Sequence, residues 1–205
     1  TNPIYDLEDF YAVFTAPSGR AYKINGFWDG NKNWKVRFMP DEIGEWTYQT
    51  YCSEEDNEGL HARTGSFACE KNQRNEAIYQ NGTIRHLKGD YHLSYANGEP
   101  FFWLACTAWN GALKSTEQEW DDYLEHRKAH HYSVIQLVAT QWRGAETNSK
   151  LQKAFSGHGK ISINPEFFQH LDQKMDKVND YGLLAAPGLL WALPKGGGRE
   201  LSPGY

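Results

Sequence analysis

The stretch from Gly98 to Asn110 constrains the fold more than any other part of the chain. A turn signal is followed by six apolar residues without polar alternation, and then by small and amide-bearing residues. Such a run is typical of a strand that is buried on both faces, and we expect this strand to begin near Phe101. An all-β pattern precedes it and a strand–helix–strand pattern follows it. Proteins with alternating β and α elements bind ligands at the carboxyl ends of their strands, so Thr107, Trp109 and Asn110 stand where a site would form. The alternative is an ordinary buried strand whose last residues only fill the core.

The length and charge of the chain limit its class and its partners. The 205 residues can form one large domain or two small ones, and we expect two. The 21 basic and 26 acidic side chains give a net charge of -5 without a basic run, so nucleic acid is not an expected partner. No apolar run approaches the roughly 18 residues of a membrane helix, so no membrane span is expected. The oligomeric state stays open.

Localisation and cofactors follow from the same survey. The chain starts at Thr1 rather than at Met, so we expect that an upstream segment such as a secretion signal has been removed or left out, and that the protein is secreted or periplasmic. We expect no cofactor and no metal. His130 and His131 are adjacent at a predicted helix end and do not face the same way. The Gly196–Gly198 run lacks the Lys and Ser or Thr of a phosphate loop.

Residues 1–72 are expected to form an immunoglobulin-like β-sandwich. Glu42, Gly44 and Trp46, spaced two residues apart, match the corner at which a strand enters the second sheet of such sandwiches. Short strands separated by turns are predicted over residues 10–14, 21–24, 34–38, 46–51 and 65–70.

This first domain has two possible roles, to bind sugar or to pack against and steady its neighbour. Trp34 and Trp46 fall on inward-facing positions, which favours packing. Phe27 and Trp28, beside the Asp29-Gly30 turn, are the better candidates for exposed aromatic side chains.

The three cysteines match neither a zinc spacing nor an even disulfide framework. Cys52 and Cys69 could face each other across adjacent strands, and the sequence leaves open whether they are bridged. Cys106 lies inside the predicted buried strand, where a small apolar role is expected.

Residues 73–97 are expected to be a junction with a short β-hairpin, and residues 98–205 to be an α/β domain. After the strand near Phe101, Thr116 and Glu119 form a capping box at the start of a helix. A second strand is predicted over residues 133–140 and a second helix from Asn164-Pro165, with Phe168, Leu171, Met175 and Val178 facing the sheet. A third strand begins at Leu183 and is expected to be interrupted by Pro187. We expect the three strands to be parallel and to be the first three βα units of a (β/α)8 TIM barrel that is truncated here.

Several motifs carry a family resemblance. The segments GFWDG at 26–30, WKVRFMP at 34–40 and GEWTY at 44–48 resemble the immunoglobulin-like domain that precedes bacterial glycoside hydrolase barrels. The segments GEPFFWL at 98–104, TAW at 107–109 and VIQ at 134–136 resemble the start of apiosidase-like barrels of glycoside hydrolase family 140.

The resemblance implies a two-carboxylate mechanism, retaining or inverting, on a polysaccharide side chain or oligosaccharide. The catalytic carboxylates of such barrels come from later strands, so they are expected beyond Tyr205. One departure is that Cys106 stands where the family carries an aspartate before Thr-Ala-Trp. If that acid orients a substrate hydroxyl, this chain has lost the contact or uses a different sugar.

The predicted strand ends carry residues suited to a sugar. Indole rings stack on sugar rings, and amides and the guanidinium of Arg143 would form hydrogen bonds with hydroxyls. The alternative for each tryptophan is packing at the barrel mouth. The predicted substrate-binding residues are Trp109, Asn110, Gln141, Trp142 and Trp191.

The sequence therefore supports two functions from different classes. The first is a glycoside hydrolase, of which this chain is an inactive amino-terminal fragment, since Glu146 and Glu200 are the only acids near predicted strand ends and neither is fixed there. The second is a non-catalytic carbohydrate-binding or scaffold protein with the same fold.

Overall fold

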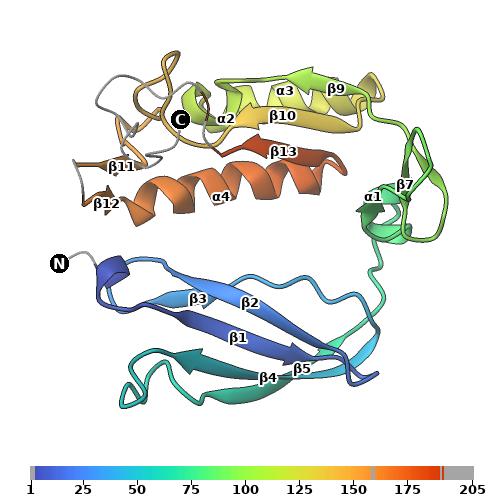
Figure 1. The fold of residues 1–205 in the computed structure, drawn as a ribbon. Coiled ribbons are helices and arrows are strands. Elements are labelled where there is room, and N and C mark those ends of the chain that lie inside the picture. Colours follow the sequence, from blue (N-terminus) through green and yellow to red (C-terminus); the bar gives the residue numbers. More distant parts are fainter. Residues whose placement is uncertain (1–2, 158–159, 190, 192–205) are drawn as a thin grey trace. The chain divides into compact units, whose positions relative to one another are not determined.

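The computed structural model describes residues 3–157, 160–189 and 191, and the chain divides into two compact units, Thr1–Gln73 and Arg74–Tyr205 (Figure 1). No helix in the described residues is long and apolar enough to cross a membrane.

The first unit is a curled antiparallel sheet with the strand order β3-β2-β1-β4-β5 (Figure 1). A short helix precedes it, and the bounds are η1 Pro3–Tyr5, β1 Phe10–Thr15, β2 Ala21–Trp28, β3 Trp34–Val36, β4 Gly44–Cys52 and β5 Thr64–Cys69. Each predicted strand is present, and β2 is longer than expected because it continues through Asn25-Gly26.

The sheet changes pairing partner in the middle of β2. Residues Ala21–Asn25 pair with β1, whereas Gly26–Trp28 pair with β3. The ring of Phe10 lies over Gly26, where a Cβ atom would be 2.1 Å from the ring. A residue without a side chain is therefore needed at this point of the strand.

One face of the curled sheet encloses an aromatic core. Ala12, Phe14 and Trp46 are buried there, and the rings of Phe14 and Phe38 stack at 4.4 Å. The indole Nε1 of Trp46 donates to the carbonyl of Glu42 at 2.9 Å, which fixes the predicted corner.

The aromatic side chains expected to be exposed in this unit are half-buried instead. Trp28 Nε1 donates to the carbonyl of Asn31 at 3.0 Å, and the Arg37 guanidinium lies 4.8 Å from the centre of the Phe27 ring. Both rings are held by their own turn and by the neighbouring strand.

The cysteines are free thiols. Cys69 pairs with Gly44 at one end of β4, and Cys52 pairs with Phe10 at the other. The eight intervening steps of β4 separate the two positions by roughly 26 Å, far more than a disulfide spans.

The second unit opens with helix α1 (Ala77–Gln80) and a small antiparallel sheet of β6 (Ile84–Arg85), β7 (Leu93–Tyr95) and β8 (Pro100–Phe101). The first two of these strands form the predicted hairpin. The expectation of one long buried strand from Phe101 is wrong, because Phe101 pairs with Leu93 and the parallel strand starts only at Ala105. Phe102 and Trp103, between the two sheets, are 77% and 46% exposed.

The predicted parallel arrangement is confirmed. Strands β9 (Ala105–Thr107), β10 (Val134–Val138) and β13 (Leu184–Gly188) form a parallel sheet in the order β13-β10-β9. Pro187 does not interrupt the last strand but pairs with Leu137 inside it. Among the described residues β13 lies at the edge of this sheet, where a proline is tolerated because its missing N–H can face away from β10.

Helices α2 (Gly111–Lys114) and α3 (Glu117–Ala129) connect β9 to β10, and α4 (Pro165–Asp180) precedes β13. A two-stranded ribbon, β11 (Phe155–Ser156) and β12 (Ser162–Ile163), lies before α4. The capping box of Thr116 and Glu119 is present, and the Asn164 side chain accepts from the backbone N–H of Glu166 at 3.1 Å. These local signals start both long helices where the sequence predicted.

The two long helices cover the same face of the parallel sheet. Ile135 and Leu137, which alternate to one face of β10, share a core with Leu124 of α3 and Leu171 of α4. The opposite face carries Thr107, Gln136 and Ala186 in one row, since these residues are paired in register.

A buried lysine joins α4 to the start of α3. Lys174 of α4 is 0% exposed, and its Nζ donates to the carbonyls of Ser115 and Thr116 at 3.1 and 3.0 Å and pairs with Glu117 at 3.1 Å. This contact could not be predicted from the sequence, because lysine is almost never fully buried.

Candidate functional site

Three segments come together at the carboxyl ends of β9, β10 and β13. The backbone N–H of Val138 donates to the carbonyl of Trp109 at 3.1 Å, and that of Ala139 donates to Gly188 at 3.0 Å. The hydroxyl of Thr140 donates to the carbonyl of Leu189 at 2.8 Å. These bonds continue the pairing beyond the strands and fix the segments that carry the predicted site.

Two of the predicted residues stack on each other at this edge. The rings of Trp109, after β9, and Trp191, after β13, lie 5.3 Å apart at an angle of 24°. Trp109 is half-buried, whereas Trp191 is 46% exposed. The pair is therefore partly accessible to solvent at the edge of the sheet where parallel α/β folds bind their ligands.

Two further predicted residues bind each other. The Trp142 indole Nε1 donates to Asn110 Oδ1 at 2.6 Å, and Asn110 Nδ2 donates to the carbonyl of Gly144 at 3.3 Å. Trp142 is buried and packs in a core with Leu113 and Phe155. Asn110 thus ties the turn after β10 to the segment after β9.

The fifth predicted residue, Gln141, is buried and fully engaged. Its Nε2 donates to the carbonyl of Phe155 at 2.6 Å, and its Oε1 accepts from the backbone N–H groups of Ala154 and Phe155 at 2.8 and 3.3 Å. In this structure the amide holds the loop before α4 against the end of β10. Sugar contact by Trp109, Asn110, Gln141, Trp142 and Trp191 stays a prediction.

Gln136 was not among the predicted site residues, whereas Thr107 beside it was. The two residues are paired in register, and Gln136 lies on the face of β10 opposite to Ile135 and Leu137 of the α3–α4 core. The signal was present in the sequence, since Gln136 is the only polar residue between Val134 and Val138.

Cys106 lies on the other face of the sheet. It pairs in register with Ile135, whose side chain belongs to the core beneath the helices. The pKa of the Tyr123 phenol on α3 is raised to about 12, mostly by burial and to a smaller extent by the neighbouring Cys106 thiol. Position 106, at which the resemblance led us to expect an aspartate, therefore faces the helix layer beside Tyr123.

The carboxyls with shifted pKa values do not suit acid catalysis. A catalytic acid needs a raised pKa, as burial produces. The pKa values of Glu42, Glu76 and Glu119 are lowered by hydrogen bonds, foremost from the Ser18 hydroxyl, the Arg74 guanidinium and the Thr116 backbone. Burial raises the pKa of Glu117, but bonds from Lys174 outweigh it, so that this pKa is lowered as well.

Of the two acids near predicted strand ends, Glu146 alone lies in the described part of the chain, and it is not fixed there. Glu146 is exposed in the loop after β10, and Glu200 lies outside the described residues. In the described ranges no group of three or more His, Cys, Asp or Glu side chains could hold a metal ion.

The parallel βα units of this chain place it in the class of α/β proteins. Proteins of this class bind ligands at the carboxyl ends of their strands, where the aromatic side chains lie here. The chain belongs to the apiosidase-like catalytic domain family, whose sequence model matches residues 87–204. A domain of unknown function, DUF5060, matches residues 1–53. No curated protein matches the chain.

One solved structure shares the fold over most of the chain. A protein from Bacteroides vulgatus ATCC 8482, named provisionally as a glycoside hydrolase, superposes with a TM-score of 0.71 at 23% identity. The match covers 92% of this chain but 38% of that protein, and it shows the fold alone. A glycoside hydrolase of family 5 from the same organism matches 52% of this chain and 24% of its own length, with a TM-score of 0.44 at 21% identity.

Proposed function

We propose that the chain is the amino-terminal part of a secreted or periplasmic bacterial glycoside hydrolase. In this proposal an immunoglobulin-like domain precedes a (β/α)8 barrel, of which β9, β10 and β13 are the first three strands. The family match and the strand order support it, because consecutive parallel strands lie side by side as in such a barrel. The substrate would be an oligosaccharide or a polysaccharide side chain.

The observation that carries the proposal is the stack of Trp109 and Trp191 at the carboxyl ends of two parallel strands. An exposed indole face is suited to the C–H face of a sugar ring, whose hydroxyls would bond to polar groups around it. Asn110, Gln141 and Trp142 would act mainly by holding the segments that carry these two rings, as their internal hydrogen bonds indicate.

Hydrolysis needs two carboxyl groups, roughly 5 to 9.5 Å apart, one protonated and one ionised. We expect both beyond Tyr205, on later strands. The 205-residue chain should therefore bind sugar without cleaving it. The second candidate, a non-catalytic carbohydrate-binding protein, would bind in the same place but would lack both carboxyls in the longer protein.

Two measurements test the proposal. Titration of the chain with neutral oligosaccharides should change its tryptophan fluorescence, and Trp191→Ala should abolish the change while Leu151→Ala, an exposed apolar residue of the loop after β10, should not. Hydrolysis of an aryl glycoside by the longer protein, and not by this chain, would support the enzyme. Cleavage by this chain alone would refute the proposed location of the carboxyls.

A further inference from the structure

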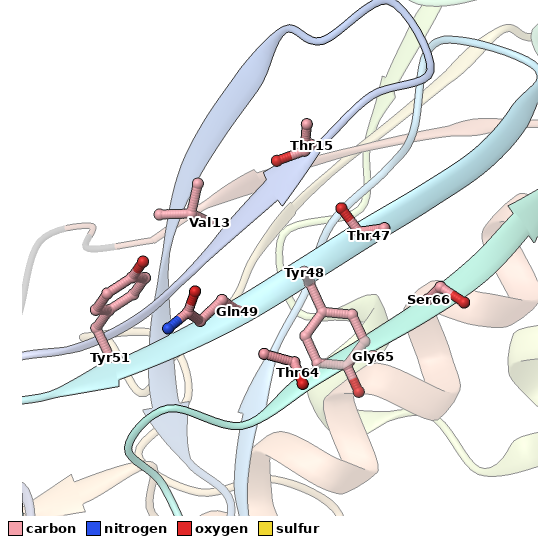
Figure 2. A pocket seen from close by; sticks show the side chains of 9 residues that line it. All are labelled: Val13, Thr15, Thr47, Tyr48, Gln49, Tyr51, Thr64, Gly65 and Ser66. Carbon is pink, nitrogen blue, oxygen red and sulfur yellow. The ribbon is translucent and has the colours of Figure 1, made fainter.

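The first unit has an open hollow on its sheet, in a different unit from the strand ends described above. The hollow has a volume of about 520 Å³ (Figure 2). Strands β1, β4 and β5 supply its lining, which consists of Val13, Thr15, Thr47, Tyr48, Gln49, Tyr51, Thr64, Gly65 and Ser66.

The strand register explains why these side chains converge. Gln49 of β4 is paired with Val13 on one side and Thr64 on the other. Thr47 is likewise paired with Thr15 and Ser66. The two rows point away from the core, because the intervening residues of β1 and β4, Phe14 and Tyr48, point toward it.

The rows carry uncharged groups that can both donate and accept hydrogen bonds. Four aliphatic hydroxyls and one amide line the hollow besides the tyrosines, and no lining side chain is charged. Within the described part of the chain, the structure records no protein hydrogen bond for these five side chains, those of Thr15, Thr47, Gln49, Thr64 and Ser66. They are available to a ligand.

Aromatic rings complete the lining. The ring of Tyr51 stacks on that of Tyr11 at 5.1 Å and 15°, beside the Gln49 row. The ring of Tyr48 lies against Gly65, where a Cβ atom would come within 2.6 Å of the phenol oxygen. Any larger residue at position 65 would displace this ring.

We propose that the hollow binds a short segment of a neutral glycan. Hydroxyl and amide groups without charge match a polyhydroxyl ligand, and the Tyr51 ring beside them matches its C–H face. The lining lacks the cationic side chains that an anionic ligand requires, and Val13 is its only aliphatic residue, so an acyl chain is a poor fit. The site goes beyond the proposed function, because it gives the first unit a sugar contact independent of Trp109 and Trp191.

The test is affinity electrophoresis of the 205-residue chain in gels that contain soluble xyloglucan, arabinoxylan, galactomannan or mixed-linkage β-glucan. At least one polysaccharide should retard the chain. Thr47→Trp, which fills the hollow, should weaken retardation at least tenfold, and Gln49→Ala should weaken it severalfold. Both sites are exposed strand positions that tolerate these residues, and circular dichroism verifies the fold. Lys32→Trp, which adds the same ring on a turn outside the lining, should leave retardation unchanged.

A second pair of variants separates this site from the strand ends. Trp109→Ala and Trp191→Ala should leave the retardation that Thr47→Trp removes. Full retardation of Thr47→Trp, or no retardation of the parent chain by any of the four polysaccharides, overturns the hollow as a glycan site. Loss of binding only in the tryptophan variants would likewise overturn it while supporting the proposed function.

Discussion

Replacing Gln141 with alanine should destabilise the second unit far more than it alters sugar binding. The side chain is 2% exposed and makes three hydrogen bonds to the backbone of the loop before α4. Alanine removes all of them and leaves two N–H groups and one carbonyl without a partner. The structure thus assigns a mechanical role to a residue whose position suggests substrate contact.

The magnitude follows from the number and quality of these bonds. Two are short, at 2.6 and 2.8 Å, and the third is longer, at 3.3 Å. A buried group that loses its partner costs about 1–3 kcal/mol, and the longer bond contributes least. Since water can enter and satisfy part of the loop, we expect Gln141→Ala to lower the free energy of unfolding by about 3–5 kcal/mol.

Urea denaturation and amide hydrogen exchange test this expectation. The transition of the second unit should move to lower urea, and the amides of Ala154 and Phe155 should exchange faster. Gln49→Ala, the same change at an exposed position of the first unit, should alter stability by less than about 0.5 kcal/mol. If Gln141→Ala unfolds like the parent chain but loses oligosaccharide binding, the structural role is refuted and direct sugar contact is favoured.

Four other outcomes are expected. Lys174→Met should lower the free energy of unfolding, measured by urea denaturation, by about 3–5 kcal/mol, because it leaves buried carbonyls and Glu117 without their cation. A decrease of less than about 1 kcal/mol would contradict this expectation. Trp46→Ala, at a fully buried ring of the first unit, should cost about 3–5 kcal/mol by the same assay, and retention of parent stability would refute the core assignment. Thr116→Ala should cost about 1 kcal/mol by removing the cap of α3, whereas Thr116→Ser should cost little. The folded pKa of Glu76 is about 2, below its usual 4.5, foremost because of a hydrogen bond from Arg74. The stabilising effect of the ionised Glu76 is therefore complete above pH 4.5 and is lost as the pH falls toward 2. The Tm of Glu76→Gln should consequently decline less over that range than the Tm of the parent chain, and parallel Tm profiles would contradict the assignment.

Much of the fold could be predicted because its signals are local. The capping box at Thr116, the Asn164-Pro165 start and the β-branched run of β10 each act within a few residues. The spacing between the apolar runs then requires crossover connections, and these make the strands parallel. Even the hairpin before β8 follows from its turn residues.

The errors arose where tertiary context decided between equal local readings. Phe101, Phe102 and Trp103 are all apolar, yet one belongs to the small sheet and two are exposed, a distinction that depends on the partner strand and not on hydropathy. Pro187 looked like a break, but an outer strand accommodates it.

At the candidate site, the location of the residues could be predicted from the sequence better than the contacts that each side chain makes. Residues just past the strand ends do meet, and Trp109 and Trp191 stack there. Whether an amide such as Asn110 or Gln141 faces a ligand or its own loop depends on loop geometry, which composition does not specify. The burial of Lys174 also depends on where Ser115 lies in space.

The Lys174 ammonium has an evolutionary consequence. Because one cation of the second βα unit, on α4 after β10, satisfies carbonyls that belong to the first unit, before α3, neither unit can be exchanged for that of a relative without matching the other. Recombination or grafting of single βα modules between such proteins should therefore succeed only when the residues at 115–117 and 174 are inherited as a set.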